Sequence, residues 1–374
     1  MIISILKEIS SNETRVSSTP ESIKLLIKSG AEVIVEKGAG NDAGFLDAEF
    51  ISAGAKIAER FECLQQGDIC LTVRMPSNKD IYKLKTSCIL IGMLNPYQNK
   101  NLIDDLNNQK LTSCCLELLP RISRAQNMDV LSSQSNLAGY RSVIDAAEQF
   151  NKAFPMMMTA AGRINPAKVM VLGVGVAGLQ AIATARRLGA VVCATDVRLA
   201  TKEQVESLGA KFIMVEDEES RQAETEGGYA KEMSEGYKVK QSQLLAETIS
   251  KQNIVICTAL IPGKPAPILI TSEMIDTMSP GSVIVDLAVE EGGNCPLSEV
   301  NKIVSYKGVK IIGYENVPGR VAKDASFLYA KNIFNFLSLI IGNKDQKITI
   351  DWEDEIIKAV VLTHEGNLKL EQFI

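Results

Sequence analysis

Short apolar runs alternate with amphipathic stretches along the first third of the chain. The run "MIISIL" at 1–6 precedes a stretch from Pro20 to Gly30 whose apolar residues Ile23 and Leu26 fall on one helical face. Further apolar runs occupy 32–36, 68–74, 88–94 and 111–118, and helical patterns occur near 47–53 and 101–108. Strands that alternate with helices build a parallel sheet covered on both faces. The pattern therefore predicts a doubly wound α/β domain.

A second alternation follows a long helical pattern over roughly 132–150 and the proline–glycine cluster "GRINPAK" at 162–168. Its apolar runs read "VMVLG", "VVCATD", "KFIMV", "NIVICTA", "SVIVDLA" and "VKIIGY". About six strands is the count of a Rossmann domain. The fold class we predict is α/β, with two doubly wound Rossmann-like domains separated by a cleft and linked by long helices.

The C-terminal region predicts a helix at roughly 322–341 and then a β-hairpin with few helical residues around it, in "KITIDWEDEIIKAVVLTHEGNLKL" (347–370). This tail does not extend the second alternation, so we expect it to cross back and complete the first domain. The predicted boundaries are 1–135 plus 325–374 for a discontinuous first domain and 136–324 for the second.

Composition and charge restrict the class of protein. The chain of 374 residues has 46% hydrophobic and 23% charged residues, as ordinary globular proteins do, and its net charge of −5 argues against nucleic-acid or anionic-membrane partners. The best candidate for a membrane span, 333–341, is interrupted by Asn335 and Ser338, whereas a span needs about 20 residues. The N-terminus has no basic start, so we expect no signal peptide.

The eight cysteines include no CxxC pair, and we expect no metal site. Most of them lie within apolar, strand-like runs, namely Cys70, Cys88, Cys114, Cys115, Cys193 and Cys257. Such positions are typical of buried, reduced thiols in a cytosolic protein.

The most informative stretch is "VMVLGVGVAGLQAIATARRLGA" (169–190), where an apolar strand runs directly into a GxGxxG sequence and a helix leaves it. Gly173 permits the tight turn, Gly175 allows a pyrophosphate to approach the backbone, and Gly178 allows close packing of helix on strand. The helix N-terminus then supplies free N–H groups and partial positive charge. The spacing predicts a dinucleotide-binding loop.

Asp196 stands eighteen residues after Gly178, at the end of the next strand. A carboxylate there accepts hydrogen bonds from the ribose hydroxyls and repels a 2′-phosphate, so NAD is favoured over NADP. Arg198 weakens this inference, because a nearby arginine can accept the phosphate.

Other polar segments are ambiguous from their spacing alone. "RISRAQNMDVLSSQSN" (121–136) either is a solvated connection or surrounds a polar ligand. "EGGYAKEM" (226–233) suits a mobile flap or a plain loop, and "TALIPGKPAP" (258–267) leaves a strand at the ligand-binding edge of the sheet. Its Lys264 could be a surface charge, and for Arg15 the spacing favours a solvated arginine.

Taken together, these segments and "GSVIVDLAVEEGGNCPLSE" (281–299) resemble the NAD(H)-binding component of proton-translocating NAD(P) transhydrogenases, over nearly the whole chain up to about residue 340. That family is similar to alanine dehydrogenase, which is the alternative. Alanine dehydrogenase uses a lysine, a histidine and an aspartate on its amino acid. The corresponding stretches here hold Arg74, no histidine, and Glu290, and the sole histidine, His364, is expected in a surface turn. The amino-acid site is therefore expected to be dismantled.

Hydride exchange between two nicotinamides forms and breaks no O–H or N–H bond, so it needs close approach of the rings in a water-poor site and no general acid. The resemblance implies that Arg121, Gln126 and Asp129 hold the nicotinamide and its ribose, that Ser132 contacts the carboxamide, and that Tyr229 closes as a lid. Arg121 and Asp129 could also pair with each other. The NAD(H) contacts it implies are Arg121, Ile122, Ser123, Gln126, Ser132, Gly173, Gly175, Val176, Gly178, Asp196, Val197, Arg198, Gly228 and Leu260.

The resemblance also implies a homodimer that binds NAD(H) and works with an NADP(H)-binding subunit and membrane-embedded proton-channel subunits. Such a chain is expected in the cytoplasm, peripheral to the inner membrane through its partners, without inserting into the membrane. A non-catalytic NAD-binding module is a further possibility that the sequence leaves open.

Overall fold

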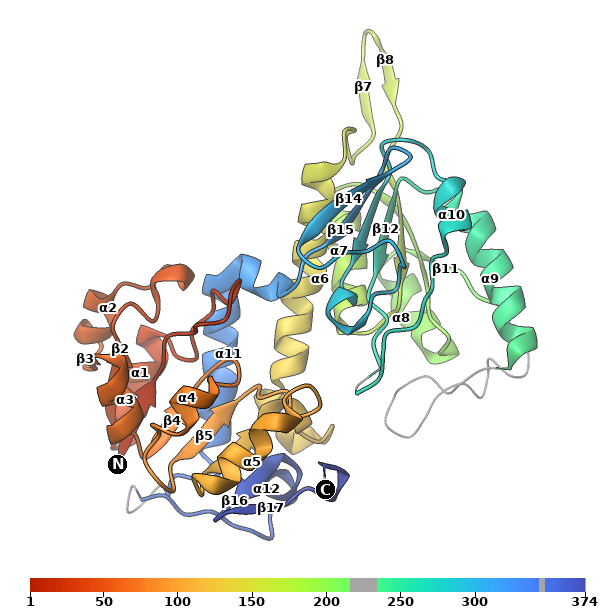
Figure 1. Ribbon diagram of the computed structural model, residues 1–374. Coiled ribbons are helices and arrows are strands. Elements are labelled where there is room, and N and C mark those ends of the chain that lie inside the picture. Colours follow the sequence, from red (N-terminus) through yellow and green to blue (C-terminus); the bar gives the residue numbers. More distant parts are fainter. Residues whose placement is uncertain (216–233, 262, 343–346, 374) are drawn as a thin grey trace. The chain divides into compact units, whose positions relative to one another are not determined.

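The computed structural model describes residues 1–215, 234–261, 263–342 and 347–373. The chain divides into two compact units, Met1–Gln134 with Pro318–Ile374, and Ser135–Val317 (Figure 1). Each unit is built on a mostly parallel sheet with helices, which confirms the predicted α/β class. Helix α6 (Val130–Gln149) begins in the first unit and continues into the second.

The first unit contains an eight-stranded sheet in the order β17-β16-β6-β5-β4-β1-β2-β3. Strands β1 to β6 are parallel. Their bounds are β1 Ile2–Ile5, β2 Glu32–Glu36, β3 Lys56–Ala58, β4 Ile69–Leu71, β5 Ile89–Gly92 and β6 Thr112–Cys115. The helices are α1 Pro20–Lys28, α2 Asp47–Ser52, α3 Arg60–Gln66, α4 Asn78–Ile81, α5 Lys100–Asn108, α11 Ala322–Leu337 and α12 Glu355–Val360. Three short elements, β3, α3 and α4, were not predicted.

The C-terminal tail completes the first sheet, as predicted. Strand β16 (Val361–His364) pairs antiparallel with β6, and β17 (Asn367–Leu368) forms a hairpin with β16. The prediction of few helical residues around the hairpin was wrong, because α12 precedes it directly, with Asp354 as its N-cap. Helix α11 also ends at Leu337, earlier than predicted.

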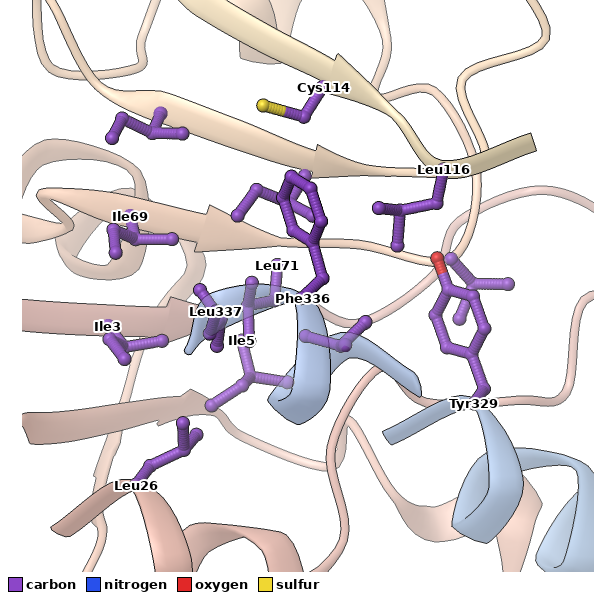
Figure 2. Packing of buried hydrophobic residues seen from close by; sticks show 14 of the residues in the cluster. Ile3, Ile5, Leu26, Ile69, Leu71, Cys114, Leu116, Tyr329, Phe336 and Leu337 are labelled. Atoms are coloured by element: carbon purple, nitrogen blue, oxygen red, sulfur yellow. The ribbon is translucent and has the colours of Figure 1, made fainter. Parts of the chain in front are cut away.

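Helix α11 supplies the centre of the first unit's core. Its residues Tyr329, Phe336 and Leu337 are buried among apolar side chains of the parallel strands (Figure 2). Burying a side chain the size of phenylalanine or leucine contributes about 1.5–3 kcal/mol each. The Tyr329 hydroxyl donates to the Thr72 carbonyl at 2.9 Å and accepts from the Met93 amide at 3.2 Å. The helix is thus fixed to the carboxyl ends of β4 and β5.

The second unit contains a seven-stranded sheet in the order β11-β10-β9-β12-β13-β15-β14. The strands are β9 Lys168–Leu172, β10 Val191–Thr195, β11 Lys211–Phe212, β12 Ile254–Cys257, β13 Val283–Asp286, β14 Lys302–Tyr306 and β15 Val309–Gly313, and the helices are α7 Val176–Arg187, α8 Lys202–Ser207, α9 Glu235–Ile249 and α10 Ser272–Asp276. The prediction of six strands omitted β14, an antiparallel edge strand. Its side chains are mostly exposed, so it lacks the apolar run of a buried strand.

A small hairpin of the second unit was also missed. Strands β7 (Met157–Thr159) and β8 (Gly162–Ile164) form a separate two-stranded sheet in which every residue is exposed. In Figure 1 it projects from the end of its unit. The three methionines Met156, Met157 and Met158 and Ile164 are all more than two-fifths exposed.

The predicted burial of the thiols is confirmed except at Cys193. All eight cysteines are free, and all but Cys193, which is half-buried, are buried. Burial raises the pKa of Cys193 to about 11 and the pKa of Cys70 to about 12, which makes both poor nucleophiles at neutral pH. Among the residues that the structure describes, no helix has the length and apolar character of a membrane span.

Candidate functional site

The carboxyl ends of β9, β10 and β12 meet at the point where the strand order reverses. Strands β9 and β12 are neighbours, and the connection after β9 leads to β10 on one side whereas the connection after β12 leads to β13 on the other. In open α/β sheets this switch point is where ligands bind. Gly173, Asp196 and Thr258 each follow one of these three strands, and the structure therefore brings the predicted phosphate loop and the predicted acid together.

The glycine loop has the geometry that its sequence predicts. Gly173 has φ +93°, a conformation that side chains disfavour, and its carbonyl accepts from Thr258 Oγ1 at 2.9 Å. A Cβ on Gly178 would lie 2.0 Å from the Gly173 carbonyl oxygen, so only glycine allows this approach of helix to strand.

Gly175 differs from its neighbours because a Cβ there would meet nothing within 4 Å. Gly175 is also the N-cap of α7, and as a glycine it has no side chain to bond the first amides of the helix. Open space beside the uncapped N-terminus of a twelve-residue helix is the setting that suits a pyrophosphate. These residues fit a dinucleotide, with Val176 beginning the helix.

The carboxylate of Asp196 accepts hydrogen bonds from Val174 and Arg198 of the same chain. Its Oδ2 accepts from the Val174 amide at 2.8 Å, and its Oδ1 accepts from the Arg198 amide at 2.9 Å. The guanidinium of Arg198 adds a bond to each oxygen, both of 2.8 Å, and also donates to the Val174 carbonyl at 3.2 Å. Asp196 thereby links the glycine loop to the end of β10, and Val197 lies between the paired residues.

The segment after β12 is held by Asn294, which the sequence reasoning missed. Asn294 is fully buried, accepts from the Ala259 amide at 3.1 Å, and donates to the carbonyls of Ala259 and Pro267. Leu260, the next residue, is 47% exposed, and Lys264 is exposed. Asn294 thus fixes the ends of the loop, while Leu260 and Lys264 of the loop are exposed.

Residues 121–132 of the first unit form a 3-10 helix, η3 (Ser123–Met128), followed by the start of α6. Ala125 and Met128 are buried in the core, whereas Arg121, Ser123 and Gln126 are exposed and Ile122 is half-buried. The segment is an anchored turn with polar side chains pointing outward. Gly228 and Tyr229, the other predicted contacts, lie outside the described residues.

Asp129 caps α6. Its Oδ1 accepts from the Ser132 amide at 2.9 Å, and its Oδ2 accepts from Ser132 Oγ at 2.6 Å. The carboxylate thus bonds Ser132, and its pairing with Arg121 stays a prediction. An acid three residues before a helix amide is a favoured cap, and capping satisfies a carboxylate without an arginine.

Arg124 faces the C-terminal tail. Its two terminal nitrogens bond the Asp354 carboxylate at 2.6 and 2.8 Å. This contact raises the pKa of Arg124 and lowers the pKa of Asp354. Arg124 therefore anchors the segment rather than adding to a ligand site.

The prediction of a solvated Arg15 was wrong, because Arg15 is only 3% exposed. Its Nε and Nη2 bond Glu13 at 2.8 and 2.7 Å, and its Nη1 donates to Gln134 Oε1 at 2.8 Å. Arg74 Nε also bonds Glu13, at 3.0 Å. The two arginines hold the pKa of Glu13 at about 2 although burial opposes this. All three guanidinium nitrogens of Arg15 thus bond the protein itself.

Two further carboxyls lie at the same edge of the first sheet. Glu8 accepts from the amides of Val73 and Arg74, and Glu117 accepts from the Asn95 amide. Burial raises the pKa of both carboxyls to about 7, in spite of these donors. Glu290, in the second unit, accepts from the Asn316 amide at 2.7 Å.

His364 is not in a surface turn, as was predicted, but at the end of β16. Its ring stacks on Trp352 with centroids 4.1 Å apart, and its Nδ1 lies 2.9 Å from Thr112 Oγ1. Desolvation lowers its pKa. Strand β16 has only four residues, too few to give a periodic signal for this placement.

The chain has two α/β units, and in one of them a strand leads through a glycine loop into a helix, with an acid at the end of the next strand. These features define a two-domain protein of the dinucleotide-binding class. Residues 4–138 match the model of the alanine dehydrogenase/PNT N-terminal domain, and residues 142–371 match that of the alanine dehydrogenase/PNT C-terminal domain. The chain belongs to the alanine dehydrogenase/PNT family.

Both branches of that family are represented among its relatives. The chain is 54% identical over 372 residues to the first portion of the NAD(P) transhydrogenase alpha subunit of Rhodospirillum rubrum, covering 98% of this chain and 97% of the relative. A crystal structure of transhydrogenase from Sinorhizobium meliloti superimposes with a TM-score of 0.91 at 50% identity, covering 98% of this chain and all of that one. Alanine dehydrogenase of Methanococcus maripaludis is 27% identical, covering 96% of this chain and 92% of its own.

Proposed function

We propose that this chain is the NAD(H)-binding component of a proton-translocating NAD(P) transhydrogenase and takes part in direct hydride transfer from NADH to NADP⁺ held by a partner subunit. The observation that carries this proposal is the 54% identity to a transhydrogenase subunit through both domains. The alanine dehydrogenase relative shares half of that identity.

Residues of the second unit would bind the phosphates and the adenosine ribose of NAD(H). Support comes from the open space at Gly175, the uncapped start of α7 and the carboxylate of Asp196 beside the glycine loop. Val176, Val197, Arg198 and Leu260 surround the same strand ends, and Gly228 and Tyr229 would join them from the flap.

Residues of the η3–α6 segment would contact the nicotinamide half. When bound, the dinucleotide supplies the hydride at its C4 atom. Gln126 can donate to and accept from the carboxamide or the ribose, and Arg121 lies in the same turn. Asp129 would orient the Ser132 hydroxyl toward the carboxamide through the bonds that already join them. No residue of this set needs to give or take a proton.

The alanine dehydrogenase alternative is less favoured by the residues at the positions of that enzyme's amino-acid site. Arg74 stands where the dehydrogenase has its lysine, and Arg74 Nε bonds Glu13 at 3.0 Å. The stretch that corresponds to the dehydrogenase histidine contains Asn95 and no histidine.

The partners would be a second copy of this chain, an NADP(H)-binding subunit, and membrane-embedded subunits that move protons, with this chain peripheral on the cytoplasmic face. The Rhodospirillum rubrum relative is named as one portion of one subunit, which supports the existence of other chains in the assembly. Proton translocation would depend on those subunits and not on this chain.

The test is to mix the purified chain with an NADP(H)-binding transhydrogenase subunit and follow NADPH formation from NADH. We expect turnover in the mixture only. Gln126→Ala should slow turnover far more than it weakens NADH binding. Turnover of NAD⁺ with alanine by the chain alone would favour the dehydrogenase, and NADH binding without transfer in any mixture would favour a non-catalytic module.

A further inference from the structure

Asn332 is a buried polar residue in the middle of α11, 8% exposed. Its Nδ2 donates to the Asn127 carbonyl at 2.9 Å, and its Oδ1 accepts from Ser133 Oγ at 2.7 Å. Both partners lie about 200 residues earlier in the chain, one in η3 and one in the first turn of α6. One side chain therefore connects two elements that are separated by Asp129.

The residues next to the two partners are the ones that matter for the proposed site. Asn127 follows Gln126, and Ser133 follows Ser132. Gln126 is exposed and Ser132 is half-buried, so both remain available at the surface while their neighbours are tied inward. The separation of these two side chains is set by the positions of Asn127 and Ser133, and Asn332 fixes both.

Helix α11 is a rigid base for this connection. Tyr329 and Phe336, on either side of Asn332 in the helix, are fully buried in the first unit's core. A third tie runs from Gln134 Nε2 to the Ala325 carbonyl at 3.1 Å. The start of α6 is thus bonded to α11 at two places, Ser133 to Asn332 and Gln134 to Ala325. Asn332 also bonds η3.

The geometry points to Asn332 as a positioning residue for the proposed hydride-transfer site, acting by holding Gln126 and Ser132 at a fixed separation. The inference rests on the proposed function, since it requires that these two residues contact the nicotinamide half of NAD(H). A shift of about 1 Å in a positioned group can lower the rate of transfer on the order of 100-fold. Loss of the connection should therefore slow transfer more than it weakens binding.

Asn332→Asp tests the connection with a chemical switch. A carboxylate keeps the acceptor for Ser133 but replaces the Nδ2 donor with a charged oxygen that repels the Asn127 carbonyl, which Asn335 alone then has to hold, whereas a protonated carboxyl can donate to that carbonyl. Burial favours the protonated form. We expect hydride transfer by N332D to fall about 10-fold or more at pH 8, to recover as the pH is lowered, and to show a change of less than about twofold in the Kd for NADH.

The charged groups on the surrounding elements are unchanged in this variant, so comparison with the unmodified chain at each pH isolates the new carboxyl. On α11, η3 and the turns next to η3 they are Lys323, Asp324, Lys331, Arg121, Arg124 and Asp129, and on α1 and η1, which pack against α11, they are Glu21, Lys24, Lys28 and Asp42. Asp129 is engaged by Ser132, and Arg124 by Asp354.

Asn335→Asp is the matched control. Asn335, one turn later on α11, also donates to the Asn127 carbonyl at 2.9 Å but is more exposed and does not bond Ser133. We expect N335D to transfer hydride within about twofold of the unmodified chain at all pH values, because Asn332 still holds both ends. Thermal unfolding of both variants establishes that each is folded under assay conditions.

Two outcomes would overturn the inference. Transfer by N332D at the unmodified rate at pH 8, or equal slowing of N332D and N335D, would show that Asn332 does not position the site. Gln126→Ala separates this failure from failure of the proposed function: a slow Gln126→Ala with a normal N332D refutes only the role of Asn332. Absence of transfer by the unmodified chain would refute the function itself.

Discussion

The guanidinium of Arg198 makes a bidentate contact with the Asp196 carboxylate, with Nε 2.8 Å from Oδ1 and Nη2 2.8 Å from Oδ2. The pair is largely buried, with side-chain exposures of 18% and 7%. With the amides of Val174 and Arg198, four protein donors hold one carboxylate, so a ribose hydroxyl would bond Asp196 by taking the place of one of the Arg198 side-chain bonds. The residue expected to exclude a 2′-phosphate thus also neutralises the arginine that could bind one.

Asp196→Ala should therefore relax selectivity for NADH over NADPH by two routes. It removes a negative charge, and it frees Arg198 for a phosphate. Charge-assisted hydrogen bonds contribute about 1.5–3 kcal/mol, so we expect NADPH affinity to rise on the order of 10-fold. Equilibrium titration with both nucleotides measures this. The double variant Asp196→Ala/Arg198→Ala should lose the gain, and unchanged selectivity in the single variant would mean that the ribose binds elsewhere.

The buried Glu13–Arg15 pair should be a large contributor to the stability of the first unit only while both partners are present. Arg15→Met leaves Glu13 buried with Arg74 as its remaining cation, and breaking a buried pair typically costs about 3–5 kcal/mol. Glu13→Gln/Arg15→Met should cost much less than the sum of the single variants, since no unpaired charge remains. Urea unfolding of the three variants measures the coupling, and additive losses would contradict a paired role.

Glu8 should make folding sensitive to pH. Burial raises its pKa from 4.5 to about 7. Between these values the folded chain retains a proton that the unfolded chain releases, so the free energy of unfolding should fall as pH rises, by at most about 1.4 kcal/mol per pH unit. Glu8→Gln should reduce this slope without abolishing it, because burial also raises the pKa of Glu117 to about 7 and Glu117 contributes in the same direction. The exposed Glu32→Gln is the control, and a slope that Glu8→Gln leaves intact would place the titration elsewhere.

Exposed methionines on the β7–β8 hairpin suggest where a second copy would bind. An isolated two-stranded sheet is marginally stable in water, and Met158 is 74% exposed. Met158→Asp should shift a dimer toward monomer in sedimentation velocity at micromolar concentration. Ile51→Asp, which changes a similarly exposed apolar residue on α2, should not. Equal sedimentation of both variants and the unmodified chain would exclude the hairpin as the contact.

Local rules account for what the sequence predicted well. Gly173, Gly178 and Asp196 were recognisable because strand, turn and helix lie within 30 residues and each glycine has a steric reason. Arg15 could not be placed in the same way. Its burial depends on Gln134, 119 residues away, and a charged residue reads as exposed until such a partner is known.

The two asparagines that hold loops in place could not be predicted from the sequence for the same reason. Asn294 and Asn332 sit among ordinary polar and apolar neighbours, and only the folded chain brings them to the loops that they hold. The bonds of Asp129 to Ser132 could not be predicted either, because a cap bond competes with an ion pair and sequence spacing cannot rank the two.

Transfer of deuterium from NADH to NADP⁺ tests whether the hydride passes directly between the two nucleotides. NADH carrying deuterium at C4 would be incubated with NADP⁺, this chain and an NADP(H)-binding transhydrogenase subunit in ordinary water, and the NADPH analysed by mass spectrometry. We expect the deuterium to be retained at C4 of NADPH, because no step of direct hydride transfer passes through an exchangeable O–H or N–H bond. Deuterium lost to water, or NADPH formed only when an amino acid is added, would contradict it.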